Sequence, residues 1–258
     1  MRKILKLIKS IRNLYVNLNY LLFSLKYFGL ILKSNKLQIT GTGVLQLFFD
    51  NYIIKIPLGK LSDLNLKKEY NNYLKLKNSN LSKYVEYKLE KINSIYKIEK
   101  LQNIKNIDIN KILKDIEEEK IQENEEINLS FDLLNKWCKE DFKYDFKYEK
   151  SVMHGDLTPR NVMLNKNNKV VLIDLDRFTF SGIKGIDKLH FIIEKECKEK
   201  KIDFFDWILE NFDKVEKKDL FIYFVYRINI ENFDSIKLPD IYYKKACKVY
   251  KKFIKEFS

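Results

Sequence analysis

VMHGDLTPRNVMLNKNNKVVLIDLDRF, which spans residues 152–178, is the stretch that decides the fold. Asn161 follows Asp156 by five residues, and Asp174 follows Asn161 by thirteen. Kinase-type phosphoryl transfer uses this spacing, because one carboxylate can orient and deprotonate an acceptor hydroxyl. An amide oxygen and a second carboxylate are hard ligands that suit Mg²⁺. We therefore expect Asp156 to be catalytic and Asn161 and Asp174 to be metal ligands.

The residues between Asn161 and Asp174 indicate how these groups are brought together. Residues 162–164 are apolar and predict a short strand, residues 165–169 are polar and predict a turn, and residues 170–173 predict the return strand. The sequence thus predicts a loop followed by a hairpin, with Asp174 at the end of its second strand.

Three features of this stretch resemble the aminoglycoside phosphotransferase and choline kinase superfamily. They are His154-Gly155-Asp156 in place of His-Arg-Asp, Thr158-Pro159 before Asn161, and Ile173-Asp174-Leu175-Asp176 in place of Asp-Phe-Gly. Residues 185–191 are similar to the helix start that follows in that family. The resemblance implies an α+β, bilobal, protein-kinase-like fold with a small β-rich N-lobe and a larger helical C-lobe. It also implies ATP as phosphate donor, bound with Mg²⁺ in the cleft between the lobes.

A kinase fold requires a glycine-bearing hairpin and a strand lysine upstream. Residues 37–40, 44–49 and 52–56 predict three strands joined by turns. Gly41 and Gly43 in the first turn would let backbone N–H groups approach phosphate oxygens, although an ordinary hairpin turn explains them equally well. Lys55 in the third strand would pair with the α- and β-phosphates.

A helix glutamate should then pair with Lys55. Residues 66–74 have a helical pattern, and Glu69 within them is the natural partner. Glu86 and Glu90 are competitors. Residues 83–101 predict two further strands that complete a five-stranded sheet, and residues 99–103 would form a hinge whose backbone, at Glu99 and Leu101, hydrogen-bonds adenine.

The remainder of the chain predicts helices. They are expected at 108–120, 129–139, 187–200, 204–212, 218–228 and 239–257. We divide the chain into a helical extension at 1–36, an N-lobe at 37–101 and a C-lobe at 102–258. Its 258 residues suffice for one catalytic unit.

The cysteines and the apolar runs bear on the compartment. Cys138, Cys197 and Cys247 are odd in number and far apart, so we expect neither a disulfide framework nor zinc. The apolar run at 13–25 is shorter than the roughly 20 residues that a membrane span needs. A cytoplasmic protein is the simplest expectation.

The net charge of +13 does not indicate nucleic acid as a partner. Only five of the 49 basic residues are arginines, whereas base reading favours arginine, and no known nucleic-acid-binding module is present. Residues 1–36 hold eight basic side chains and no acidic one, with apolar residues at helical spacing. This basic amphipathic helix could pack on the kinase core or make peripheral contact with the inner face of a membrane.

Several polar residues near the motif are secondary candidates. Asp176 could support the metal site or pair with Arg160 or Arg177. In a chain that uses Lys for most positive charge, Arg160 and Arg177 suggest a demand for a planar fork, such as contact with an acidic or phosphorylated acceptor. His154 is expected to hold the loop by hydrogen bonds, and His190 to be structural.

The acceptor hydroxyl is not defined by the motif. A sugar or glycolipid, of the lipopolysaccharide type, would suit an N-terminal helix at a membrane; a soluble amino alcohol, amino sugar or antibiotic is the alternative. An acidic patch at Asp203, Asp206 and Glu210 could bind a cationic acceptor or be a solvated helix face. A protein kinase is disfavoured because no Asp-Phe-Gly or Ala-Pro-Glu follows, and a non-catalytic nucleotide-binding module because the Lys, Asp, Asn and Asp set is complete.

Overall fold

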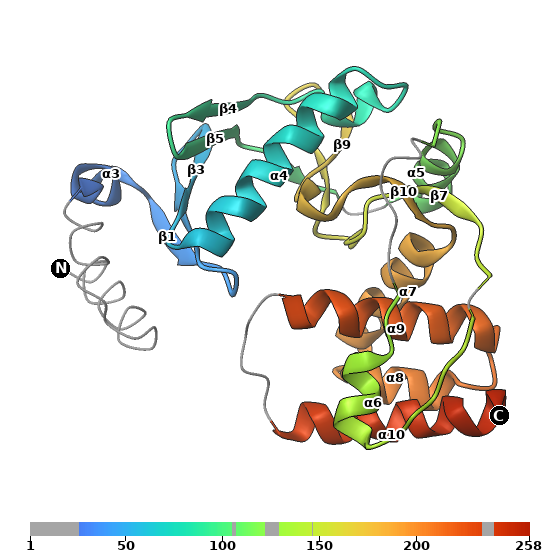
Figure 1. Cartoon of the computed structure of the whole chain (residues 1–258). Coiled ribbons are helices and arrows are strands. Elements are labelled where there is room, and N and C mark those ends of the chain that lie inside the picture. Colours follow the sequence, from blue (N-terminus) through green and yellow to red (C-terminus); the bar gives the residue numbers. More distant parts are fainter. Residues whose placement is uncertain (1–25, 105–106, 122–128, 146, 234–239) are drawn as a thin grey trace. The chain divides into compact units, whose positions relative to one another are not determined.

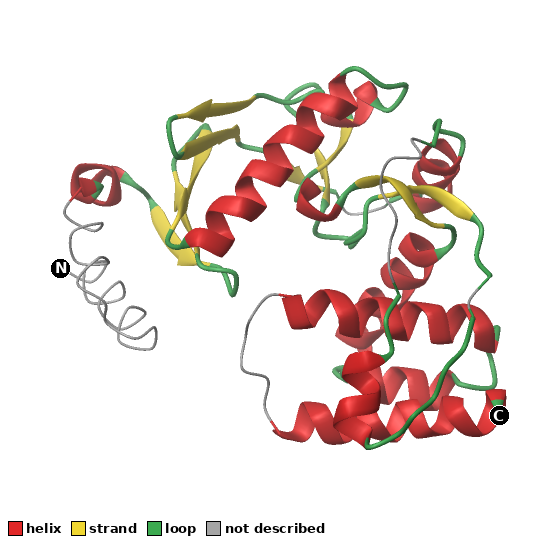
Figure 2. Ribbon diagram, viewed as in Figure 1, coloured by secondary structure: helices red, strands yellow, loops and turns green. Residues whose placement is uncertain are grey.

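The computed structural model describes residues 26–104, 107–121, 129–145, 147–233 and 240–258 (Figure 1). The described residues form two compact units, one from 26–104 with 162–176 and one from 107–161 with 177–258. The first 25 residues of the expected amphipathic extension lie outside the described part. Figure 2 shows that the first unit holds most of the strands and the second most of the helices. The expected α+β class is confirmed.

A five-stranded antiparallel sheet organises the first unit. Its strands are β1 (Lys36–Ile39), β2 (Val44–Phe48), β3 (Tyr52–Pro57), β4 (Leu89–Ile92) and β5 (Ile95–Glu99), in the order β1-β2-β3-β5-β4. The register pairs Lys55 of β3 with Gln46 of β2 and Tyr96 of β5. Lys55 therefore lies in the central strand of the sheet, where both edges of its backbone are paired.

Helix α4 (Lys60–Lys77) follows β3 and contacts it (Figure 1). It is twice as long as the expected segment 66–74, because residues 60–65 and 75–77 also belong to the helix. The buried face of α4 includes Leu66, Glu69, Tyr73 and Leu76 at helical spacing. One carboxylate, that of Glu69, is therefore carried into an otherwise apolar and aromatic layer.

A second, three-stranded sheet completes the first unit. It consists of β6 (Gln102–Asn103), β8 (Val162–Leu164) and β9 (Val170–Leu172), in the order β6-β8-β9. The predicted hairpin around 165–169 is thus present, but it groups with the first unit rather than with the C-lobe in which we placed it. Only part of 83–101 is strand, because residues 82–85 form a short 3₁₀ helix, η1 (Ser82–Val85).

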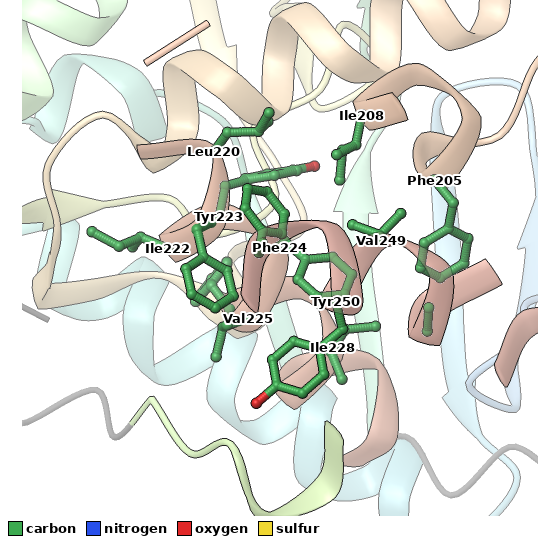
Figure 3. Packing of buried hydrophobic residues seen from close by; sticks show 14 of the residues in the cluster. Phe205, Ile208, Leu220, Ile222, Tyr223, Phe224, Val225, Ile228, Val249 and Tyr250 are labelled. Atoms are coloured by element: carbon green, nitrogen blue, oxygen red, sulfur yellow. The ribbon is translucent and has the colours of Figure 1, made fainter. Parts of the chain in front are cut away.

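Helices make up most of the second unit, which contains an apolar core. They are α5 (Ile109–Glu117), α6 (Asp132–Cys138), α7 (Ile186–Lys200), α8 (Phe204–Asn211), α9 (Lys217–Phe233) and α10 (Asp240–Phe257). Figure 3 shows side chains of α8, α9 and α10 meeting in this core, among them Phe205, Phe224 and Val249. Fully burying one such side chain stabilises the fold by about 1.5–3 kcal/mol. Helix α9 is apolar on most sides, which fits a central position.

Two short strands frame the loop of interest and were not predicted. Strand β7 (Lys150–Met153) pairs antiparallel with β10 (Thr179–Ile183). The sequence predicts no strand in either segment, because four- and five-residue strands without clean alternation give little sequence signal. Strand β7 ends immediately before His154, so this ribbon fixes the start of the loop that carries Asp156.

The expectation about cysteines was wrong. Cys138 of α6 and Cys247 of α10 form a disulfide, and Cys197 is the remaining thiol. The two partners are 109 residues apart, and only the packing of α6 on α10 brings them together. The cysteine pattern therefore no longer supports a reducing compartment.

Among the described helices, none combines the length and apolar character that a membrane-spanning segment requires.

Candidate active site

Three charged side chains meet in the first unit. The Nζ atom of Lys55 lies 2.8 and 3.0 Å from the two carboxylate oxygens of Glu69 and 2.8 Å from Oδ1 of Asp174. The Lys55 and Glu69 side chains are buried, whereas that of Asp174 is 44% exposed. The structure thus joins Lys55 and Glu69, which are 14 positions apart, to Asp174, which follows Lys55 by 119 positions.

The charges of this cluster depend on one another. Burial alone would lower the pKa of Lys55, but the carboxylates of Asp174 and Glu69 outweigh it and raise that pKa well above the usual range. Burial raises the pKa of Glu69, against the opposing effect of Lys55. Lys55 is therefore held as a cation beside a partly exposed carboxylate, which suits a group that has to contact phosphate.

The competing glutamates are engaged elsewhere. Glu86 pairs with Lys169 at 2.6 Å, and Glu90 pairs with Lys88 at 2.8 Å, both with exposed side chains. Glu69 therefore forms the ion pair with Lys55 that we expected, and neither competitor does. Exposed ion pairs of this kind contribute little to stability.

The segment that carries Asp174 is anchored from two sides. The Asn72 amide of α4 donates to the Leu175 carbonyl at 2.7 Å. The Asn165 amide in the β8–β9 turn donates to the Glu86 carbonyl at 2.6 Å. Asp174 itself has a φ of 55°, a left-handed conformation that Asp tolerates better than most residues. These contacts hold its carboxylate on Lys55.

In the second unit, a buried carboxylate holds the His154–Asp156 turn. Asp187, in the first turn of α7, accepts the backbone N–H of His154 at 2.6 Å and that of Gly155 at 2.9 Å. The His154 ring accepts the Asp156 N–H through Nδ1 at 3.3 Å, and the Tyr226 hydroxyl donates to the Gly155 carbonyl at 3.1 Å. His154 thus holds the loop by hydrogen bonds, as predicted.

The Asp156 carboxylate is surrounded by donors and positive charge. His190 Nε2 lies 3.1 Å from its Oδ1. One Nη atom of Arg177 and one of Arg227 lie 3.7 and 3.6 Å from the same oxygen. Burial opposes ionisation of Asp156, but the His190 hydrogen bond and the two guanidinium charges outweigh it and hold the pKa of this carboxyl well below its usual range.

Our expectation that His190 is only structural was therefore incomplete. Its ring touches Asp156 on one side and the Tyr223 hydroxyl, at 2.9 Å from Nδ1, on the other. Arg227 and Asp187 were not singled out at all. Each is a single polar residue within a helical pattern, which gives no sequence signal for a role at the site. The hydrogen bonds from His190 to Asp156 and from His154 to Asp187 also join residues more than 30 positions apart.

Asn161 is oriented by Asp156. Its amide nitrogen donates to the Asp156 backbone carbonyl at 2.8 Å and to Oδ2 at 3.2 Å. The amide oxygen then points away from these acceptors, and Asp174 keeps a partly exposed carboxylate. Both residues thus present the hard oxygen donors that Mg²⁺ prefers, so the donor chemistry fits the expected metal ion.

Other predicted residues receive less support. Arg160 lies on the surface and pairs with Glu194 at 3.8 Å, so it does not contact Asp156. The Gly43 N–H donates to the Thr40 carbonyl within the turn. A hydrogen bond from this turn to a phosphate oxygen would therefore come from another residue, such as Gly41. The Glu99 N–H donates to the Lys88 carbonyl. The adenine contacts expected at Glu99 and Leu101 stay a prediction.

Two carboxylates of the acidic patch share one lysine. Lys245 of α10 lies 2.6 Å from carboxylate oxygens of both Asp203 and Asp206. These contacts fit a solvated helix face rather than a site for a cationic acceptor.

Solved structures share this fold. A choline kinase from Streptococcus pneumoniae, LicA, is 16% identical, with a TM-score of 0.51, and the match covers 91% of this chain and 96% of that protein. The ternary complex of APH(2")-IIa with streptomycin and ATP is 15% identical, with a TM-score of 0.52 and coverage of 92% and 97%. No protein-family model and no curated protein matches the sequence. The chain thus shares the fold of these solved enzymes, which is the fold that the resemblance predicted.

Proposed function

We propose that this protein is an ATP-dependent phosphotransferase that moves the γ-phosphate to a hydroxyl group of a small molecule. The observation that carries the proposal is the pair of clusters described above. One holds a buried cation, Lys55, against Glu69 and the carboxylate of Asp174. The other holds an ionised carboxylate, Asp156, beside the amide of Asn161. Their residue types and order along the chain are those of kinase-type transfer.

Each residue would have one task. Lys55, oriented by Glu69, would bind the α- and β-phosphates, and backbone groups at Gly41, Glu99 and Leu101 would contact the nucleotide. Asp156 would orient the acceptor hydroxyl and receive its proton. Because the pKa of Asp156 is low, its main contribution would be orientation, which suits a loose transition state that needs little help from a base.

Asn161 and Asp174 would hold Mg²⁺ through their oxygen atoms. When bound, the ion would neutralise charge on the phosphate oxygens. Asp174 contacts Lys55 through one carboxylate oxygen. Its carboxylate would therefore be shared between the ion and Lys55.

The acceptor is proposed at the level of its class. Solved proteins with this fold include a choline kinase and a complex with streptomycin, so amino alcohols and aminoglycosides are the first acceptors to test. A sugar or glycolipid is the second candidate, since residues 1–36 carry eight basic side chains and no acidic one and could bring the enzyme to an anionic membrane.

A transfer assay tests the proposal. The protein and its Asp156→Asn variant are incubated with γ-labelled ATP, magnesium and a cell extract, and the label is followed into protein, lipid and small soluble fractions. We expect label in the soluble fraction that the variant does not produce. Label in protein would indicate a protein kinase, and a melting temperature that Mg-ATP does not raise would contradict nucleotide binding altogether.

A further inference from the structure

Helix α3 (Phe28–Lys33) directly precedes β1 and packs on one face of the five-stranded sheet (Figure 1). Ile31 is fully buried in a cluster that includes Ile54 and Ile56 of β3. Because successive side chains of a strand point to opposite faces, Lys55 lies on the other face of the sheet. The sheet therefore separates α3 from the Lys55 cluster.

The C-terminal end of α3 is tied to the residues around it. The Ser34 hydroxyl donates to the Ile31 carbonyl at 2.8 Å, and the Asn35 N–H donates to the Phe48 carbonyl of β2 at 2.8 Å. Together with the burial of Ile31, these hydrogen bonds fix which side of the helix faces the sheet. The side that faces outward is therefore fixed as well.

That outward side carries two large apolar residues. Phe28 is 42% and Leu32 is 51% exposed, and they lie on the same side of the helix because they are four positions apart. Single apolar residues are ordinary at a protein surface, whereas adjacent ones call for an explanation. Among the exposed large apolar side chains of the described residues, no other pair lies within one turn of a helix.

Only positive charge borders this apolar pair in the sequence. Lys26, Lys33 and Lys36 are exposed. The first acidic residue of the chain is Asp50, whereas residues 1–49 contain eight basic residues. If the 36 acidic residues were spread evenly, a stretch of this length would hold about seven of them. A lysine-rich composition explains why the positive charges are lysines, but it does not explain why negative charges are excluded.

The two features together favour a lipid surface as the partner. A solvated helix face needs no exposed apolar pair, and a nucleic-acid site needs positive charge but no apolar side chains. A contact with a second copy of the chain would use the apolar pair, but it would not require the exclusion of acidic residues. Apolar residues bordered by lysines, without carboxylates that anionic headgroups would repel, are typical of helices that lie at a membrane surface.

We propose that the outward side of α3 docks on the surface of an anionic lipid bilayer, with Phe28 and Leu32 inserted at the level of the headgroups and the neighbouring lysines close to the anionic lipids. Buried apolar area and electrostatic attraction both contribute to binding of this kind. The inference goes beyond the proposed phosphotransferase activity and does not depend on it. Because α3 and Lys55 lie on opposite faces of the sheet, the lipid surface does not compete with the nucleotide for the Lys55 cluster.

Vesicle binding tests the proposal. The full chain is mixed with vesicles of phosphatidylcholine alone, or of phosphatidylcholine with about 30% phosphatidylglycerol, which gives the surface a negative potential. Cosedimentation measures the fraction of protein bound at increasing lipid concentration. We expect the partition coefficient to be at least about tenfold higher for the anionic vesicles and to fall as salt is added, because salt screens the charges.

Substitutions on α3 separate the two contributions. The double variant Phe28→Ser with Leu32→Ser should lower partitioning into anionic vesicles by at least about tenfold, because it removes the inserted apolar area. Lys33→Gln should lower it by about fivefold, as expected for one lysine near an anionic surface. Two matched controls on α4 should leave it unchanged: Leu64→Ser, since Leu64 is 49% exposed, and Lys68→Gln, since Lys68 is also exposed.

A fluorescent reporter at position 28 remains informative even if the serine variants fold poorly. Phe28→Trp places an indole ring at the exposed position, where it can be accommodated. The two native tryptophans, Trp137 and Trp207, belong to the second unit, so the parent protein provides the background signal. We expect the added fluorescence to shift to shorter wavelength with anionic vesicles and to be quenched by lipids brominated near the headgroup.

Several outcomes would overturn the proposal. They are equal partitioning into neutral and anionic vesicles, a tryptophan at position 28 that brominated lipids do not quench, and serine variants that bind vesicles as the parent does. The last result would assign vesicle binding to the basic residues alone. Serine variants that weaken binding of a DNA duplex rather than of vesicles, or that change the oligomeric state without lipid, would assign α3 to nucleic acid or to a second copy. In each case, a melting temperature that Mg-ATP raises would leave the phosphotransferase proposal intact.

Discussion

His190 joins Asp156 to Tyr223: its Nε2 lies 3.1 Å from Asp156 Oδ1, and its Nδ1 lies 2.9 Å from the Tyr223 hydroxyl. The ring is almost fully buried, on the α7 face that packs against α9. The simplest arrangement has Nε2–H donating to the carboxylate and the tyrosine hydroxyl donating to Nδ1. Asp156 is thus held by a ring that is itself held in one tautomer.

Removing this support should impair turnover more than nucleotide binding. We expect His190→Ala to lower kcat by up to about 100-fold through misplacement of Asp156. Since the His190 hydrogen bond lowers the pKa of Asp156, its loss should raise that pKa, and the acid limb of the pH–kcat profile should move to higher pH. Tyr223→Phe, which keeps the ring but not the hydroxyl, should have a smaller effect in the same direction.

The measurement is a pH profile of kcat together with the KM for ATP. His190→Gln serves as the conservative control, because its amide can still donate to Asp156 and should restore part of the rate. A rise in the KM for ATP with unchanged kcat would contradict a role through Asp156.

The Lys55 cluster should be important for both stability and activity. Lys55→Met leaves two carboxylates near one another without their cation, and breaking a buried pair in this way typically costs about 3–5 kcal/mol. We also expect kcat to fall by about 10²–10³, which is typical for loss of one group that stabilises developing charge. Urea unfolding and steady-state kinetics would measure the two effects.

Lys169→Met is the matched control for this cluster. Its ion pair with Glu86 has a similar length, 2.6 Å, but both side chains are exposed. Its loss should cost no more than about 1 kcal/mol. Equal destabilisation by the two variants would show that burial of the Lys55 pair has no energetic consequence.

The elements that could be predicted are those whose signals are local. The spacing of Asp156, Asn161 and Asp174 lies within one loop and hairpin, so a single stretch of sequence contains it. Lys55 and Glu69 belong to a strand and a helix that follow each other directly. The helices of the second unit were also found, including three of fewer than ten residues, since a repeated apolar face marks a helix in the sequence.

What could not be predicted depends on contacts between distant elements. Asp187 and Arg227 reach the loop from α7 and α9, and nothing in their neighbouring residues distinguishes them from surface charges. The Cys138–Cys247 pair depends on how α6 packs on α10. Strands β7 and β10 are stabilised by pairing with each other. Neither has a periodic pattern of its own that could be recognised in the sequence.

Gly155 should resist substitution for two separate reasons. Its φ is 80°, and a Cβ atom there would lie 2.5 Å from the Arg177 carbonyl oxygen. We expect Gly155→Ala to cost about 1–2 kcal/mol for the left-handed backbone and about 1–3 kcal/mol for overpacking. Thermal unfolding would measure the sum, and the pH–kcat profile should shift because the loop carries Asp156.

Two other glycines separate these costs. Gly185 has a φ of 83°, but a Cβ atom added there would have no neighbouring atom within 4 Å, so Gly185→Ala should show the backbone cost alone. Gly29, in helix α3 (Phe28–Lys33), has neither constraint, and Gly29→Ala should leave stability unchanged or raise it by up to about 1 kcal/mol. Equal effects at Gly155 and Gly185 would rule out the steric contribution.

The disulfide should be detectable from the number of free thiols. With the Cys138–Cys247 disulfide in place, the denatured protein should show one thiol without reductant and three after reduction. Reduction should lower the free energy of unfolding by about 2–4 kcal/mol, because the disulfide closes a long loop in the unfolded chain. Three thiols before reduction would show that α6 and α10 are not covalently joined.

Cys197 should remain a poor nucleophile in the native protein. Burial, together with the negative charges of Glu194 and Asp203, raises the pKa of its thiol to about 11. The thiolate is the reactive form, so the alkylation rate of the native protein should still be rising at pH values where an ordinary thiol is already fully ionised. Cys197→Ser isolates this signal, since the other two cysteines are paired. A native alkylation rate that levels off near the ordinary thiol pKa of about 8.5 would contradict the buried, acid-flanked environment of Cys197.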